Sequence, residues 1–171
     1  CFIRKKEGES LKKQVFKAAV VGLMLLLIGA DAGNVTAQEP TLPPLQKKAV
    51  FTVNQSAVQV DEAGFTIDVS PYIEKDRIFL PARYLGEVLG AEVIWNEADK
   101  EAAFKLQNGK VLILKIGEIF LNNNGKYELM DVAPAVIPPG RICLPARYVC
   151  EAAGYNVVWE KDTQQMIVKR K

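Results

Sequence analysis

Histidine, the side chain that most often serves as acid or base in catalysis, is absent from this 171-residue chain. Without an imidazole, neither a serine–histidine nor a cysteine–histidine dyad can form, and imidazole-ligated zinc or copper sites are excluded. Carboxylates do occur in close pairs, which in a cleft would supply the acid and the nucleophile of a glycosidase. The pairs are Asp61 with Glu62, Glu97 with Asp99, and Glu160 with Asp162. All of them fall in predicted hairpin turns, so we expect solvated turn residues, no catalytic residues, no metal and no cofactor.

Most of the remaining candidate residues occur twice. The segment from Arg77 to Trp95 matches the segment from Arg141 to Trp159 at a constant offset of 64 residues, with 11 of 19 positions identical. Upstream, Asp68-Val-Ser-Pro71 matches Asp131-Val-Ala-Pro134. The repeated residues are Asp68, Arg77, Pro81, Arg83, Glu87, Gly90 and Trp95 in the first copy, and Asp131, Arg141, Pro145, Arg147, Glu151, Gly154 and Trp159 in the second. A match of this length indicates two copies of one structural unit.

In each copy an arginine and a glutamate stand four residues apart, which on a helix places both on one face. The pairs are Arg83 with Glu87 and Arg147 with Glu151. Such arginines can hold an anionic ligand, for example a cell-wall polymer. We favour a partly buried ion pair that fixes the orientation of the helix and reaches Asp68 or Asp131 just upstream.

The two tryptophans, Trp95 and Trp159, end equivalent predicted strands. An exposed tryptophan can stack on a sugar ring, but equivalent apolar positions in two copies are more typical of a core. We therefore expect the repeated motif to be mainly structural.

The elements that position these residues follow from prolines, glycines and the spacing of apolar residues. In residues 80–90 a proline stands where the first helical turn tolerates it, apolar residues follow at helical spacing, and a glycine ends the run. Residues 144–154 repeat this pattern. Strands are predicted around the two helices, for example at 92–96 and 110–116.

The predicted fold is therefore α+β, with antiparallel β-hairpins packed around two short helices. Each helix is too short to be stable alone. Two homologous repeats, at about 49–110 and 111–171, are expected to share one core.

Residues 1–37 have the organisation of a secretory signal peptide. Basic residues in 1–17 precede an apolar stretch of 13 residues and then small polar residues. Cleavage is expected before Gln38, and a second suitable point lies before Gly33. A membrane anchor is disfavoured because about 20 apolar residues are needed to span a bilayer. Residues 38–48 would then be an exposed leader on a protein that is secreted or associated with the cell envelope, with no transmembrane span after cleavage.

The charge is divided unevenly along the chain. Residues 1–37 hold 6 Lys+Arg and 3 Asp+Glu, whereas residues 38–171 hold 16 and 17. The later part is nearly neutral, which argues against nucleic acid as a partner because that binding requires clustered positive charge.

Two cysteines, Cys143 and Cys150, lie in residues 38–171. A disulfide can form in an exported protein, but their predicted positions, just ahead of a helix and on it, favour two buried free thiols.

The motif Pro-Tyr-Ile-x-x-x-Arg-x-x-Leu-Pro-x-Arg-Tyr-x-x-Glu-x-Leu-Gly-Ala-x-Val-x-Trp, which begins at Pro71, resembles the copper amine oxidase N-terminal domain-like (stalk) family. The resemblance covers residues 50–170 and is to the tandem form found in exported proteins of Gram-positive, Firmicutes-type bacteria. It implies an antiparallel sheet curved around a helix, remote from the copper and the quinone of the amine oxidases. It does not imply amine oxidation, because the imidazole ligands and the Asn-Tyr-Asp/Glu segment that supplies the quinone are missing here.

Together these features predict an exported, non-catalytic binding or spacer module of the cell envelope without amine oxidase activity. Its partner would be a cell-wall polymer, another exported protein or a second copy of the chain. Two alternatives stay open: an accessory fragment of a larger exported enzyme such as a cell-wall hydrolase, and an inhibitor or partner-binding protein for such an enzyme.

Overall fold

Every second residue points inward along the central strands of the structure. The strand β8 (Val111–Lys115), for example, buries Leu112 and Leu114 and turns its other side chains outward. Successive side chains of a strand project to opposite faces, so this alternation gives the sheet one apolar face. The computed structural model describes residues 39–171. The signal peptide expected over residues 1–37 and both of its cleavage points lie outside the described residues.

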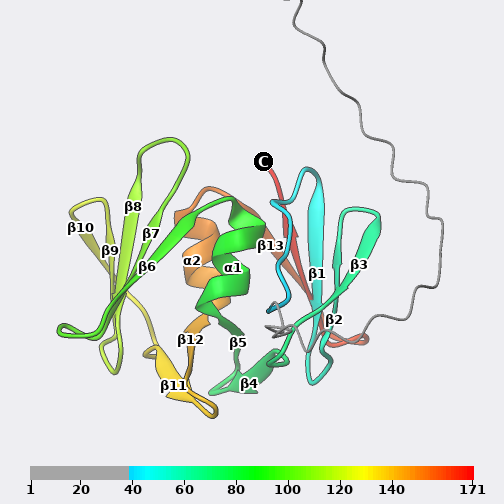
Figure 1. Ribbon diagram of the computed structural model, residues 1–171, viewed down its shortest axis with the longest axis horizontal. Coiled ribbons are helices and arrows are strands. Elements are labelled where there is room, and N and C mark those ends of the chain that lie inside the picture. The colour runs from blue at the N-terminus through cyan, green and yellow to red at the C-terminus, as the bar shows by residue number, and fades with distance from the viewer. Residues whose placement is uncertain (1–38) are drawn as a thin grey trace, which may run out of the picture. The chain divides into compact units, whose positions relative to one another are not determined.

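The strands form three antiparallel sheets (Figure 1). The first has the order β13-β14-β1-β2-β3 and consists of β1 (Lys48–Thr52), β2 (Ala57–Val60), β3 (Ala63–Thr66), β13 (Asn156–Glu160) and β14 (Gln165–Lys169). The second has the order β10-β9-β8-β7-β6 and consists of β6 (Glu92–Asn96), β7 (Glu101–Lys105), β8, β9 (Phe120–Asn123) and β10 (Lys126–Leu129). The third has the order β11-β12-β5-β4 and consists of β4 (Tyr72–Glu74), β5 (Arg77–Pro81), β11 (Ala135–Ile137) and β12 (Arg141–Pro145).

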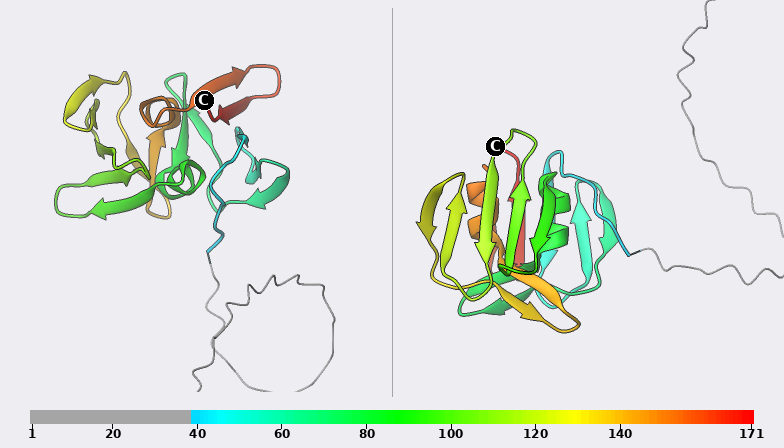
Figure 2. Two further views of the ribbon diagram at one scale, coloured as in Figure 1. Left: turned by 90° about the horizontal axis from the view of Figure 1, so that it is seen from above. Right: turned by 60° about the vertical axis from the view of Figure 1, so that its left-hand side comes forward.

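Two helices lie between the five-stranded sheets, and the four-stranded sheet lies below them in the view of Figure 1 (see also Figure 2). They are α1 (Ala82–Leu89) and α2 (Ala146–Ala152). Each begins directly after a proline, Pro81 or Pro145, and each is followed by a glycine with positive φ, 65° at Gly90 and 94° at Gly154. The predicted α+β class, with antiparallel strands around two short helices, is confirmed.

The apolar faces of the two large sheets and the helices meet in one core. α1 contributes Leu85 and Val88, and α2 contributes Val149 and Cys150, all without exposed surface. Burial of each such aliphatic side chain is worth about 1.5–3 kcal/mol, which is what holds helices this short in place. No helix in residues 39–171 is long and apolar enough to cross a bilayer.

The four-stranded sheet joins the strands that lead into the two helices. β5 pairs antiparallel with β12, with Leu80 directly opposite Leu144. Both leucines are fully buried. Because α1 follows β5 and α2 follows β12, this pair of leucines lies at the centre of the contact between the two halves of the described chain.

The first and the last strands of the described chain are also neighbours. β1 pairs with β14 over five residue pairs, from Lys48 opposite Lys169 to Thr52 opposite Gln165. The N–H of Arg170 continues the ladder by donating to the carbonyl of Lys47 at 3.1 Å. Strands from both ends are therefore required to complete this sheet.

The leader expected to be exposed over residues 38–48 is exposed only in part among the residues described. Leu42 and Leu45 are only 5% and 2% exposed, and the N–H of Leu45 donates to the carbonyl of Val88 on α1 at 2.9 Å. Lys48 already belongs to β1. Two buried leucines are enough to hold a proline-containing segment against the core. We call residues 39–47 the N-terminal strap.

Gly86, in the middle of α1, lies against β6 so closely that a Cβ added to it would be 2.1 Å from Cγ2 of Val93. We expect Gly86→Ala to lower the free energy of unfolding by about 1–2 kcal/mol, because the overpacking outweighs the better helix propensity of alanine. Urea unfolding followed by circular dichroism measures this change. Gly64→Ala, where no atom lies within 4 Å of the added Cβ, is the control. Equal midpoints for the two variants would contradict the prediction.

Candidate functional site

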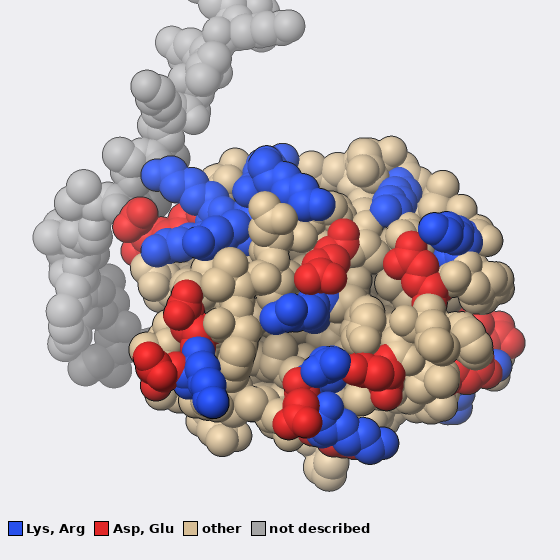
Figure 3. Space-filling view, turned by 180° about the vertical axis from the view of Figure 1, so that it is seen from behind, with Lys and Arg blue, Asp and Glu red and all other residues tan. Residues whose placement is uncertain are grey.

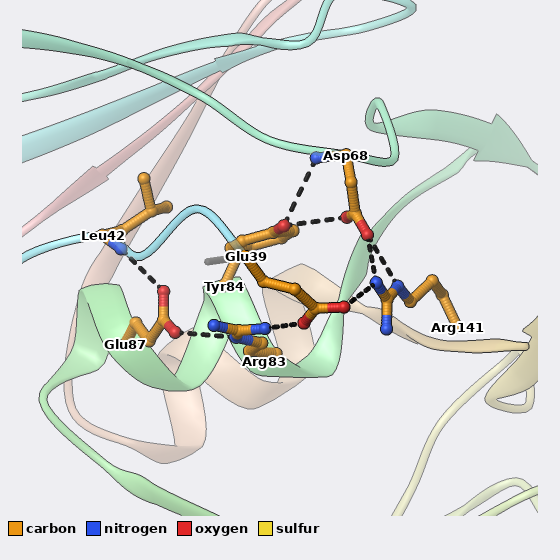
Figure 4. A network of polar contacts seen from close by, with 7 residues as sticks. All are labelled: Glu39, Leu42, Asp68, Arg83, Tyr84, Glu87 and Arg141. Carbon is orange, nitrogen blue, oxygen red and sulfur yellow. Dashed lines mark hydrogen bonds and ion pairs between the residues drawn. The ribbon is translucent and has the colours of Figure 1, made fainter. Parts of the chain in front are cut away.

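On α1, Arg83 and Glu87 form the ion pair expected from their spacing, with Arg83 Nε 3.0 Å from Glu87 Oε1. The other carboxylate oxygen, Oε2, accepts a hydrogen bond from the backbone N–H of Leu42 at 2.7 Å. Arg83 also pairs with Glu39 at the start of the N-terminal strap. The pair on the helix therefore holds the strap across α1 (Figure 4).

Glu39 binds a second arginine as well. Its carboxylate lies 2.7 Å from Nη2 of Arg141, the first residue of β12. Arg141 in turn donates through Nε to Asp68 at 2.7 Å, and the hydroxyl of Tyr84 on α1 donates to the same aspartate at 2.8 Å. One polar network thus links the strap, α1, β12 and the segment before β4 (Figure 4).

Around α2 some of these contacts recur with the residues of the other copy. Arg77, the first residue of β5, pairs with Asp131, and its Nε lies 3.2 Å from Oδ1. The N–H of Asp131 lies 3.3 Å from the hydroxyl oxygen of Tyr148 on α2 and donates to it. Each aspartate therefore touches the tyrosine of its own copy and the first arginine of the other.

This arrangement corrects the expectation that Arg83 and Arg147 reach Asp68 and Asp131. The two aspartates are bound instead by Arg141 and Arg77, which begin β12 and β5. The physical reason is the antiparallel pairing of these two strands, which carries the first residue of each strand away from its own copy.

The equivalent pair on α2 is open. Arg147 and Glu151 are both exposed, and no ion pair joins them within the described part of the chain. They line a groove of about 480 Å³ that is bounded by α2, β13 and the β4–β5 hairpin. Arg77 also lines it, and Ile73 and Trp159 give it an apolar wall.

Both tryptophans are half-buried and pack against the main core, as expected of structural residues. The indole N–H of Trp95 donates to Glu97 at 2.7 Å. Trp159 belongs to the groove at α2 as well as to the core margin. The side chain of Trp159 therefore packs against the core and also lines the groove at α2.

Cys143 and Cys150 are free and buried, as predicted. Burial raises the pKa of Cys143 to about 12 and also raises the pKa of Cys150. A nucleophilic cysteine needs a lowered pKa, so neither thiol has the surroundings of a catalytic residue.

The paired carboxylates organise turns. Asp61 accepts hydrogen bonds from three consecutive backbone N–H groups, which are those of Gln46, Lys47 and Lys48 at 2.7–2.9 Å. Glu97 accepts from Trp95 and pairs with Lys100. Among the residues from 39 to 171, no three His, Cys, Asp or Glu side chains are grouped to hold a metal ion.

The outer surface mixes charges of both signs on the face seen in Figure 3, with no large area of one sign. Exposed apolar side chains gather on the hairpin of β9 and β10, where Phe120 stands opposite Leu129. The side chain of Phe120 is 48% exposed, that of Leu129 is 67% exposed and that of Tyr127 is 68% exposed. This hairpin carries three of the seven large apolar side chains that are exposed in residues 39–171.

The ionised form of Asp68 is stabilised by its surroundings. Burial opposes ionisation, but the hydrogen bonds from Tyr84 and Arg141 outweigh it and hold the pKa of Asp68 below its usual value. The pKa of Asp131 is lowered in the same way, against burial, by Tyr148 and Arg77. Both aspartates are therefore charged at neutral pH.

A carboxyl group whose pKa is lower in the folded than in the unfolded state contributes stability above the unfolded pKa and loses it as the pH falls through the folded pKa. We expect the urea midpoint to drop as the pH is lowered below about 4. Asp68→Asn should be less stable at pH 7 by about 1–2 kcal/mol and should lose part of that acid dependence. Unfolding curves between pH 2 and 7 measure both effects, with Asp162→Asn in an exposed turn as control. The same acid dependence in Asp68→Asn and the parent protein would argue against the network.

Three participants were not apparent from the sequence. Glu39 has no counterpart in the second copy, so no repeated pattern marks it. Tyr84 and Tyr148 do recur within the matched segments, and their repetition is the signal that could have identified them.

Comparison with known families gives one match. A family model described as Copper amine oxidase N-terminal domain matches residues 48–168. No curated protein and no solved structure matches the chain.

Proposed function

The chain belongs to the copper amine oxidase N-terminal domain family, and from this we propose that it is exported and acts at the cell envelope as a non-catalytic binding or spacer module. The observation that carries the proposal is the extent of the match. Residues 48–168 include both helices and all fourteen strands of the described chain, apart from the last residue of β14. The family is a non-catalytic, stalk-like domain. The proposed role accordingly uses surfaces rather than a reaction centre.

The export part of this proposal is supported by residues 1–37, where a basic region precedes an apolar stretch of 13 residues. The near-neutral charge of residues 38–171 and the mixed charges in Figure 3 favour partners other than nucleic acid. The partners we propose are a cell-wall polymer, another exported protein or a second copy of the chain. The exposed apolar hairpin of β9 and β10 supports the last of these.

We also propose that the two sequence copies correspond to two interlocked structural units, as in the tandem form of the family in Firmicutes-type bacteria. Two observations support this. The two large sheets are built alike: each begins with the two strands that follow a helix and continues with three further strands. The order is β6-β7-β8-β9-β10 in the sheet that begins after α1, and β13-β14-β1-β2-β3 in the sheet that begins after α2. Leu80 and Leu144, which are equivalent in the sequence match, stand opposite each other.

Co-sedimentation of the purified protein with isolated cell-wall sacculi, over a series of salt concentrations, tests the binding role. We expect saturable binding that persists at moderate salt, and a weaker binding of Trp159→Phe than of its counterpart Trp95→Phe if the groove is used. Sedimentation equal to that of a control protein of similar charge would contradict a wall-binding role and leave the spacer role.

A further inference from the structure

α1 and α2 carry the same arginine–glutamate pair, but only the pair on α1 is covered. Glu39 of the N-terminal strap pairs with Arg83, and the N–H of Leu42 donates to Glu87. On α2 the equivalent side chains, Arg147 and Glu151, are exposed. The structure thus shows one occupied and one open version of the same helix face.

The occupied version shows what such a face binds. The carboxylate of Glu39 lies between two guanidinium groups, those of Arg83 on α1 and Arg141 on β12. Three residues later the strap donates a backbone N–H to the helix glutamate and buries the side chain of Leu42. The recognised features are therefore a carboxylate, an extended backbone and a leucine in the order Glu-x-x-Leu.

The open version has the matching groups. By the 64-residue offset, Arg147 corresponds to Arg83, and Arg77 corresponds to Arg141. Both Arg147 and Arg77 line the groove of about 480 Å³, together with the carboxylates Asp76 and Glu151. Arg77 is already paired with Asp131, just as Arg141 binds Asp68 and Glu39 at the same time. Two guanidinium groups facing one space form a site that suits a carboxylate.

The apolar wall of the groove can receive the leucine of such a segment. Ile78, Val157 and Trp159 line it beside the charged groups. The strap itself is held at α1 by its buried leucines and by the hydrogen bond from Leu45 to Val88. On α2 the carbonyl equivalent to that of Val88 belongs to Ala152 and already accepts from Nζ of Lys110 at 2.5 Å. A ligand of the α2 groove therefore needs the Glu-x-x-Leu part of the strap and not its later part.

From this comparison we infer that the groove at α2 is a docking site for an extended acidic segment of a partner protein, with a carboxylate between Arg147 and Arg77 and a leucine three residues further on. The inference goes beyond a role at the cell envelope. It rests only on residues that the structure describes, so it does not depend on export.

The probe for this site is a blocked peptide with the sequence of residues 39–46, Glu-Pro-Thr-Leu-Pro-Pro-Leu-Gln. It is titrated into the full chain carrying Trp95→Phe, so that the emission of Trp159 reports on the groove. We expect a saturable change in emission. Arg147→Ala should weaken the affinity at least about tenfold, and so should a peptide with glutamine in place of glutamate, because each removes a charge-assisted hydrogen bond. Arg170→Ala, an exposed arginine outside the groove, is the matched control and should bind like the parent protein.

Three results would overturn the inference. One is the absence of any saturable change at millimolar peptide. Another is binding that is insensitive to Arg147→Ala but lost in Arg83→Ala, which would mean that the peptide only displaces the strap from α1. The third is a chitin oligosaccharide that binds at Trp159 when the peptide does not, which would make the groove a sugar site.

Discussion

Replacing Leu144 by alanine is expected to lower the free energy of unfolding by about 2–5 kcal/mol. Leu144 is fully buried in β12 and stands opposite Leu80 of β5, at the place where the surroundings of the two helices meet. Truncation there removes apolar contacts and leaves a cavity that two paired strands cannot close. Urea unfolding measures the loss, and Leu129→Ala, which truncates a leucine that is 67% exposed, should change stability by less than about 0.5 kcal/mol.

The same substitution at both leucines tests whether they act as a pair. Residues directly opposite each other on neighbouring strands share one face of the sheet, so their side chains interact. We expect Leu80→Ala and Leu144→Ala to be non-additive in a double-mutant cycle. Strictly additive losses would show that each leucine packs against its own helix and sheet without depending on the other.

The second large effect is expected in the N-terminal strap, where Leu45→Ala should lower the free energy of unfolding by about 2–5 kcal/mol. Leu45 is 2% exposed, and its N–H is bonded to the carbonyl of Val88. Residues 48–81, which contain the strands β1 to β5, separate the strap from α1 in the sequence, yet the helix depends on the strap for cover. Thermal or urea unfolding followed by circular dichroism provides the measurement.

Thr41→Ala is the matched control for the strap, because Thr41 is exposed and lies in the same segment. It should leave the unfolding midpoint nearly unchanged. Were Leu45→Ala to behave like Thr41→Ala, the strap would be the exposed leader that the amino-acid pattern suggests. The comparison therefore decides between a leader and a part of the core.

Local signals accounted for much of the architecture. Proline before and glycine after an apolar stretch at helical spacing identified both helices, because these residues act through their own backbone geometry. Alternation of apolar residues identified strands such as β8, since the pleat alone imposes a period of two. The two buried free thiols, Cys143 and Cys150, followed from their predicted positions just ahead of a helix and on it.

Long-range contacts were the part that the sequence did not reveal. Leu42 and Leu45 are two apolar residues in a segment with three prolines, too few to show a period, and their burial depends on a helix surface formed elsewhere. The ion pair between Arg77 of the first copy and Asp131 of the second depends on which strand pairs with β5. Strand pairing is decided by the whole fold and leaves no trace in the spacing of the two residues themselves.

The pairing of β1 with β14 has a consequence for the time course of folding. Most of the domain must be brought together as a single closed loop before this ladder can form, and a contact between segments so distant in sequence slows folding. Until β14 arrives, β1 keeps one unpaired edge, so neither half of the chain can reach its final state alone. For a chain exported as we propose, folding would wait until the carboxyl end has passed through the membrane, which is the order that transport of an extended polypeptide requires.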